Sequence, residues 1–220
     1  MARILALLAL PFLAACAGSN DPDLTVPREM GLFQLGHNVV VAPGPQRGPF
    51  SRAVDEERFA AILREEMAQR FGRYEGGRLV HLGVSIEGYV VAAPGIPLVL
   101  SPKSILILNV TAWDDARGVK LNPEPEQIYV FESLGAGFLI GSGYTSSAEE
   151  QMQNLSENAA AAIQRWLLEH PGWLGMDPEA ARAARSALPR RLTPGEVAAA
   201  QAEARARAPE GVAEAAAGAG

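Results

Sequence analysis

The chain contains very few of the residues that bind metals or form disulfide bonds. Its 220 residues include one cysteine and three histidines. A single thiol cannot close a disulfide within the chain, and no second cysteine is present to help build a zinc site. The histidines, His37, His81 and His170, lie far apart in the sequence. We therefore expect no cofactor and no metal centre. A metal site made only of carboxylates is the alternative that this composition does not exclude.

The chain also lacks a basic run and a long hydrophobic run. Its formal net charge is -6, so neither nucleic acid nor charge-driven adhesion to anionic lipid is expected. The apolar stretch at residues 4–13 spans roughly 15 Å as a helix, about half the hydrocarbon thickness of a bilayer. This short stretch follows Arg3, so residues 1–15 are predicted to be a signal peptide.

The one cysteine, Cys16, stands directly after this apolar stretch, in the order Leu13-Ala14-Ala15-Cys16. The order resembles the lipobox of bacterial lipoproteins. That resemblance implies cleavage before Cys16, a diacylglycerol on its sulfur and fatty acids such as palmitate on the mature protein. The alternative interpretation is an ordinary secreted protein in which Cys16 is an incidental thiol.

The residue after the cysteine indicates which membrane would hold the lipidated protein. In lipoprotein families of Gram-negative bacteria an aspartate there marks retention at the inner membrane, whereas this chain has Ala17. The resemblance thus implies an outer-membrane protein facing the periplasm, with the inner membrane as the alternative. Residues 16–37 are predicted to form the lipidated N-terminus and a flexible tether.

Hydrophobic periodicity predicts the elements of a single α+β domain over residues 38–174. Residues 38–42 are predicted to be a short buried strand, followed by a loop at residues 43–50. Residues 51–71 are predicted to be an amphipathic helix because apolar side chains recur at steps of three and four. The apolar positions of this helix are Phe59, Ile62, Leu63, Met67 and Phe71.

Four further strands and a second long helix follow in the prediction. The strands are expected at residues 79–91, 104–113, 127–133 and 138–144, and the last two are expected to form a hairpin. Residues 104–113 are apolar on both faces at first, which is typical of a central strand. Ser147 and Glu150 have capping-box spacing, and Pro171 ends the helix that they begin.

These elements predict an α+β fold: a single mostly antiparallel sheet of four to five strands, with two amphipathic helices packed on one face. The order is strand, helix, strands, helix. Residues 175–220 are predicted to be an Ala-rich extension that is partly helical and partly disordered. Its two short helices are expected after Asp177 and Thr193, with alanines too small to hold them firmly on a core.

With the lipobox, this element order resembles a loose group of small envelope lipoproteins. Members include auxiliary lipoproteins of lipid-transporting ABC systems and lipoprotein activators of cell-wall synthases. The chain is also similar to uncharacterised lipoproteins of alphaproteobacteria. The resemblance covers residues 38–170 and implies a fold that binds partners and is not an enzyme.

Two short motifs are weak signals for chemistry. Gly141-Ser142-Gly143 precedes a helix, where backbone amides bind anions, but the third glycine of a dinucleotide motif and a Walker lysine are missing. We interpret it as small residues at a strand end. Ser101-Pro102-Lys103 lacks the helical S-x-x-K spacing of serine-lysine enzymes, so we interpret it as a loop.

Two polar positions allow a catalytic interpretation and a structural one. Asp114 and Asp115 are adjacent carboxylates, yet neighbours on a strand point to opposite faces, so a turn is favoured over a paired acid-base or calcium site. His81 alternates with apolar residues on a strand. A solvated or hydrogen-bonded sheet histidine is favoured over a catalytic base, because the sequence identifies no partner for it.

One apolar connection stands out as a candidate binding segment. Residues 92–101 contain two prolines and little polarity where a surface loop is usually polar. A loop stiffened by proline binds at a smaller ordering cost. The alternative is that this segment covers the core or begins the next strand. The candidate partner-binding residues are Ile96, Pro97, Leu98, Val99 and Leu100.

Two functional hypotheses follow from these features. The first is an outer-membrane-anchored periplasmic lipoprotein that acts as a non-catalytic binding or scaffold module for an envelope partner protein. The second is a carrier that holds a lipid or a small apolar ligand between the helices and the sheet. An enzyme acting on envelope glycan or lipid is the least favoured class, because no catalytic constellation is present in the sequence.

Overall fold

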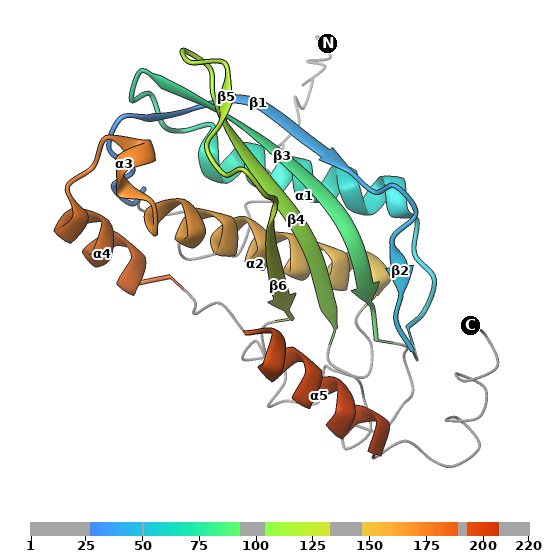
Figure 1. Ribbon diagram of the computed structural model, residues 1–220. Helices are drawn as coiled ribbons and strands as arrows, with labels where there is room; N and C mark the ends of the chain where they lie inside the picture. The colour runs from blue at the N-terminus through green and yellow to red at the C-terminus, as the bar shows by residue number, and fades with distance from the viewer. Residues whose placement is uncertain (1–26, 50, 93–103, 133–146, 189–192, 207–220) are drawn as a thin grey trace, which may run out of the picture.

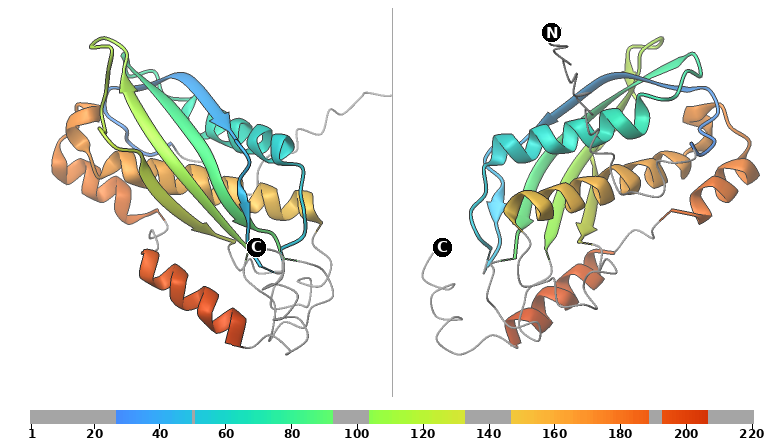
Figure 2. Two further views of the ribbon diagram at one scale, coloured as in Figure 1. Left: turned by 45° about the vertical axis from the view of Figure 1, so that its right-hand side comes forward. Right: turned by 180° about the vertical axis from the view of Figure 1, so that it is seen from behind.

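The computed structural model describes residues 27–49, 51–92, 104–132, 147–188 and 193–206. One mixed sheet of six strands forms one layer, and helices α1 and α2 lie side by side on one of its faces (Figures 1 and 2). The strands are β1 (Phe33–Val41), β2 (Gln46–Arg47), β3 (Arg78–Val90), β4 (Ile105–Asp114), β5 (Val119–Lys120) and β6 (Glu126–Phe131). The helices are α1 (Glu56–Phe71), α2 (Ala148–Leu168), α3 (Pro171–Leu174), α4 (Pro178–Ser186) and α5 (Pro194–Ala206).

The long strand β3 lies at the centre of the sheet. On one side it pairs in parallel with β1 and then with β2, and on the other it pairs antiparallel with β4. The second side of β4 pairs antiparallel with β5 and with β6. The predicted α+β fold, with a mostly antiparallel sheet and two main helices, is confirmed.

Strand β1 differs from the buried strand predicted at residues 38–42. It begins at Phe33 and lies at the edge of the sheet, where Val39 and Val41 are exposed and Val40 is buried. The prediction of a buried strand was wrong because three adjacent valines indicate burial on both faces, whereas an edge strand here turns alternate side chains away from the helices. The predicted loop at residues 43–50 also contains the short strand β2.

Helix α1 confirms the amphipathic helix, and its five predicted apolar positions are all buried. It starts at Glu56, later than predicted, because Asp55 is its N-cap and accepts a hydrogen bond from the Arg58 backbone N–H at 3.0 Å. The Arg58 side chain reaches across to α2, where its Nε donates to Glu149 Oε1 at 2.9 Å. This hydrogen bond to the carboxylate raises the pKa of Arg58 above its ordinary value.

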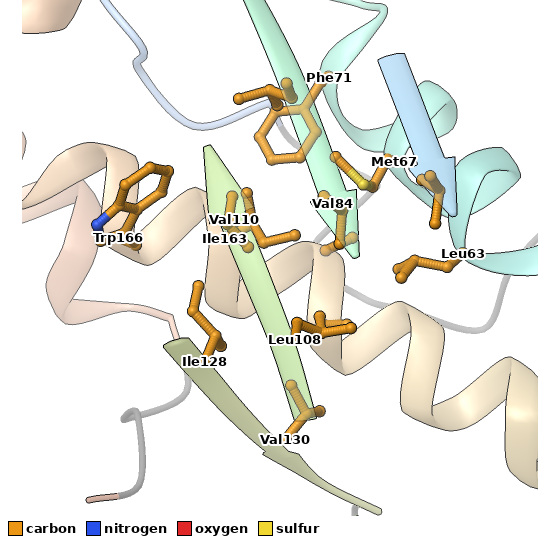
Figure 3. Packing of buried hydrophobic residues seen from close by; sticks show 14 of the residues in the cluster. Leu63, Met67, Phe71, Val84, Leu108, Val110, Ile128, Val130, Ile163 and Trp166 are labelled. Atoms are coloured by element: carbon orange, nitrogen blue, oxygen red, sulfur yellow. The ribbon is translucent and has the colours of Figure 1, made fainter. Parts of the chain in front are cut away.

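Helix α2 begins with the predicted capping box. The Glu150 backbone N–H donates to Ser147 Oγ at 3.1 Å, and the Ser147 backbone N–H donates to Glu150 Oε2 at 2.8 Å. Its apolar stripe packs with alternate residues of β3 and β4 and with α1 in one continuous core (Figure 3). The fully buried Trp166 is the largest side chain of this core.

Between α1 and α2 the buried contacts are partly polar, which the sequence analysis did not anticipate. Arg70 Nη1 donates to Gln164 Oε1 at 3.0 Å, and Gln164 Nε2 donates to Tyr74 Oη at 2.9 Å. Arg70 and Gln164 are both fully buried. Further along the same seam, Gln153 Nε2 donates to Glu66 Oε1 at 2.6 Å. The helices thus pack on the sheet mainly through apolar side chains and meet each other partly through hydrogen bonds.

The two short C-terminal helices appear where they were predicted, as α4 and α5. The expectation that alanine could not hold them on the core was wrong for α4, because Ala181 and the following Leu188 are buried members of the core. Arg165 of α2 also donates from Nη1 to the carbonyl oxygens of Arg185 and Leu188, each at 3.0 Å. These backbone acceptors at the end of α4 add to the attachment that the buried Ala181 and Leu188 provide.

Candidate functional site

The predicted lipidation site and the predicted partner-binding residues lie outside the part of the chain that the structure describes. These positions are Cys16, the candidate binding segment Ile96–Leu100, and the motifs at residues 101–103 and 141–143. The strand predicted at residues 138–144 and its hairpin lie outside it as well. What the structure does place are the points where these segments attach to the domain.

The attachment points lie at opposite ends of the sheet. We call the end where β1 and β3 begin and β4 finishes the near end, and the opposite end the far end (Figure 1). Residues 93–103 connect Ala92, just beyond the last residue of β3, to Ser104, just before β4, so both of their attachments are at the far end. The described chain that leads back toward Cys16 begins at Pro27 and enters the near end.

The near end fixes this entering chain by backbone contacts. The Leu32 N–H donates to the Leu174 carbonyl of α3 at 2.8 Å, and the Leu32 carbonyl accepts from the Arg78 N–H at 2.7 Å. Gly31 precedes this contact with φ +58, and a Cβ there would lie 2.6 Å from the Leu174 oxygen. The chain therefore joins the core at a closely packed point, with Met30 already buried.

A histidine cluster stands on the open face of the sheet close to this end. His81 of β3 accepts a hydrogen bond at Nδ1 from the His37 backbone N–H at 2.8 Å, and its Nε2 lies 2.9 Å from Asp115 Oδ1. The His37 and His81 rings stack with centroids 4.7 Å apart. Strand β1 shifts register between Leu35 and Asn38, and His81 supplies an acceptor for the N–H inside that irregularity.

These contacts define the chemistry available to His81. Because Nδ1 accepts a backbone hydrogen bond, the ring proton belongs on Nε2, where it is donated to Asp115. Both ring nitrogens are then engaged in holding β1 to β3 and to the β4–β5 turn. The predicted hydrogen-bonded sheet histidine is confirmed. Its partners could not be identified from sequence, because one is a main-chain N–H and the other lies 34 residues away.

The adjacent carboxylates Asp114 and Asp115 bind different partners and do not form a pair. Asp114 Oδ1 accepts from the Arg117 N–H at 3.1 Å, and the Gly118 N–H donates to the Asp114 carbonyl at 2.9 Å. The Asp115 side chain instead meets His81. The predicted turn is confirmed. In the described part of the chain no three His, Cys, Asp or Glu side chains are grouped so that they could hold a metal ion.

The face of the sheet opposite α1 and α2 is open over much of its area (Figure 2). Val39 and Val41 of β1 are exposed, and the polar positions Ser85 and Asn109 pair across β3 and β4. At the near end, Trp113 is exposed beside Lys120, whose Nζ lies 5.6 Å from the centre of the indole ring. None of the described helices is long and apolar enough to cross a bilayer.

The fold and these contacts define a small α+β domain with one sheet face open and two ends of different construction. No protein-family model matches the chain, and no curated protein matches it. Among solved structures, the chain is similar to a protein of Caulobacter crescentus, an alphaproteobacterium, described as a "putative lipoprotein". The two are 10% identical with a TM-score of 0.35, and the match covers 67% of this chain and 94% of that chain. A likeness this distant carries no argument about function.

Proposed function

We propose that this chain is an outer-membrane-anchored lipoprotein whose periplasmic domain is a non-catalytic binding or scaffold module for an envelope partner. The observation that carries the proposal is Cys16, which follows a short apolar run and two alanines in lipobox order. Each buried methylene of an acyl chain contributes about 0.8 kcal/mol, so two or three chains hold a protein on a bilayer essentially permanently.

The positions of the two ends support a division between anchoring and binding. The chain that follows Cys16 enters the near end, and the apolar segment with Ile96 to Leu100 attaches at the far end. Strand β3 alone runs for 13 residues between these ends. At about 3.3 Å per residue its length is about 40 Å. The residues that flank this segment, Ala92 and Ser104, therefore lie at the other end of the sheet from the point where the chain from Cys16 enters.

The polar clusters of the described residues support a non-catalytic domain. The two ring nitrogens of His81 are engaged by a backbone N–H and by Asp115, and Asp114 is engaged by its own turn. A general base needs a free acceptor within reach of a substrate proton. Each of these side chains instead has a structural role that accounts for its contacts.

The carrier hypothesis needs space between the helices and the sheet. In the described residues that layer is occupied by Leu63 of α1, Leu108 of β4 and Ile163 of α2, all fully buried in one cluster (Figure 3). We therefore favour a surface interaction over an internal ligand. Recovery of a bound lipid by native mass spectrometry of the purified protein would reverse that preference.

The proposal is tested in two independent steps. Mass spectrometry of the mature N-terminal peptide should show diacylglycerol and a further acyl group on Cys16, and an unmodified N-terminus would overturn the anchor. A photo-crosslinking residue at Leu98 should then give one discrete protein adduct in cells, while the same residue at the exposed Val41 should not. Equal adducts from the two positions would contradict a binding site at the far end.

A further inference from the structure

The hydrogen bond between His37 and His81 is one that a single proton can break. The His37 backbone N–H donates to His81 Nδ1 at 2.8 Å, so this nitrogen presents its lone pair to β1. On the other side of the ring, Nε2 lies 2.9 Å from Asp115 Oδ1 and carries the ring proton. A second proton can add only at Nδ1, where the acceptor then becomes a donor. This hydrogen bond therefore exists only while His81 is neutral.

Protonation would place two N–H groups against each other at a distance that suits only a donor and an acceptor. The proton comes from water, which reaches the ring because the His81 side chain is 23% exposed. The Nε2–H would stay on Asp115, now as an ion pair, so the ring keeps its place and the His37 N–H has to move. Because the Asp115 side chain is 50% exposed, solvent screens this ion pair, which adds little force for or against the movement.

The part of β1 that carries this N–H can move without breaking the strand pairs on either side. Strand β1 pairs with β3 up to Leu35 and again from Asn38, with a register shift between them. Gly36 and His37 therefore have no paired residue in β3. A Cβ on Gly36 would lie 2.2 Å from His81 Nδ1, so the close approach of this segment to the ring depends on glycine. The segment can thus be held against β3 or released from it while the paired residues stay in register.

The charges that face the His81 ring from β1 and β3 favour the same movement or lie far away. The His37 ring stacks on the His81 ring with centroids 4.7 Å apart, so positive charge on both rings would push β1 away from β3. Strand β1 has no other ionisable side chain. Glu87 follows His81 by six positions along β3, which is about 20 Å. Helices α1 and α2 lie on the opposite face of the sheet, so their ionisable groups do not face the ring (Figure 2).

The β4–β5 turn adds one carboxylate and two cations around the ring. Its second carboxylate, Asp114, is buried and accepts from the Arg117 N–H. Lys120 of β5 pairs with Trp113, which in turn pairs with His81, so its ammonium group is two strands from the ring. The positive charges of Arg117 and Lys120 oppose a second proton on His81. They lower the pH at which that proton binds and do not change what it does to the His37 N–H.

From this geometry we propose that His81 is a pH-sensitive latch on the edge strand β1. Neutral His81 holds the His37 N–H, and protonated His81 releases it, so that residues 36–37 move away from β3. Imidazole side chains change charge between about pH 5 and 8, so the latch is closed in neutral and open in mildly acidic surroundings. The shape of the open sheet face along β1 then differs between the two conditions. This inference does not depend on the lipid anchor.

Amide hydrogen exchange, followed by NMR on the ¹⁵N-labelled full chain in detergent micelles, tests the latch. The protection factor corrects for the intrinsic pH dependence of exchange. For the His37 N–H we expect it to fall about fivefold or more from about pH 8 to about pH 5, the loss of one hydrogen bond. The matched control is the Ala112 N–H, which donates to the non-titrating Asn122 Oδ1 at 2.8 Å and should keep its protection. An unchanged His37 N–H, or an equal fall at Ala112, overturns the proposal.

Two variants separate the His81 ring from its neighbour. His81→Asn keeps a side-chain acceptor and removes the titration, so protection of the His37 N–H should change less than about twofold over the same pH range. His37→Gln keeps the backbone N–H and removes the other imidazole, so the pH-dependent fall should remain. A fall that persists in His81→Asn, or one that disappears in His37→Gln, contradicts the latch.

Two further measurements keep the test decisive if a variant does not fold. In the unsubstituted protein, the ¹⁵N chemical shift of His81 Nδ1 reports the addition of its proton, and its midpoint should coincide with that of the His37 N–H release. Asp115→Asn should move both midpoints to lower pH, because the carboxylate favours the charged ring. Midpoints that differ in the unsubstituted protein show that another group controls β1 and rule the proposal out.

Discussion

The near end and the far end of the sheet are held together by different kinds of contact. At the near end, close backbone approaches join the entering chain to α3 and to β3, as in the Leu32 to Leu174 hydrogen bond. At the far end, serine hydroxyls add to backbone hydrogen bonds such as the one from the Arg52 N–H to the Val91 carbonyl at 3.0 Å. Ser51 Oγ accepts from the Val91 N–H at 2.8 Å, and Ser104 Oγ accepts from the Ala92 N–H at 3.3 Å.

The difference indicates where the domain tolerates change. Backbone contacts at van der Waals distance leave no room for an added atom, so the near end is sensitive to single methyl groups. A hydroxyl that satisfies one N–H can be lost at the cost of about one hydrogen bond. In the proposed function, the chain from Cys16 would join the closely packed end of the domain, and the partner-binding segment would attach at the other end.

Removal of the anchor should have the largest effect. We expect Cys16→Ala to move the protein almost entirely from the membrane fraction to the soluble periplasmic fraction, because the proposed acyl chains on Cys16 would supply the attachment. The circular dichroism spectrum and the thermal midpoint should not change, since the domain contacts described above do not include residue 16. A protein that stays in the membrane fraction after this change would show that another part of the chain anchors it.

At the near end, Gly31→Ala should cost about 2–4 kcal/mol of unfolding free energy. The left-handed backbone, φ +58, disfavours a side chain, and the new Cβ would lie 2.3 Å from Met176 Cγ. Gly44→Ala is the matched control, because Gly44 also has positive φ, +70, but no atom lies within 4 Å of its Cβ position. Urea denaturation should give a clearly smaller loss for the control, about 1 kcal/mol. Equal losses would mean that backbone strain, and not close packing, makes the near end sensitive.

The close approach of β1 to His81 should show as coupling between two substitutions. A Cβ on Gly36 would lie 2.2 Å from His81 Nδ1, so Gly36→Ala should cost about 2 kcal/mol. In a His81→Ala background the same substitution should cost less than half as much, because the clashing ring is absent. Additive losses in a double-mutant cycle measured by urea unfolding would show that Gly36 is needed for a different reason.

The smallest effect is expected at the far end. Ser104→Ala removes the acceptor for the Ala92 N–H and should cost about 1 kcal/mol. Ser85→Ala, on the open face of β3, should change stability by less than about 0.5 kcal/mol in the same chemical denaturation assay. A loss at Ser104 as large as that at Gly31 would remove the contrast between the two ends.

Local signals in the sequence were sufficient for the two long helices. The capping box at Ser147 and Glu150 depends on residues three apart, and the stripe of α1 on steps of three and four, so both could be predicted without tertiary structure. The prediction was wrong where position in the sheet decides burial. Three adjacent valines in β1 indicate a buried strand, and only strand order reveals that this strand is at the edge.

The candidate sites also differ in whether they depend on neighbouring residues in the sequence or on contacts between distant elements. Cys16 could be proposed from the sequence because the lipobox is a contiguous motif, and it stays a prediction. The roles of His81, Arg70 and Trp113 could not, because each depends on a partner from another element: the His37 N–H, Gln164 and Lys120. The registers that create those pairs result from packing the whole chain.

For this protein the sequence by itself determined the periods of its helices and strands, their caps and turns, and the resemblance to an exported, lipidated chain. The tertiary structure alone decided that the N-terminal chain and the apolar connection join opposite ends of one sheet. The physical reason is the range of the interactions. Periodicity and capping depend on residues a few positions apart, whereas sheet edges and contacts between helices arise when distant segments are buried in one core.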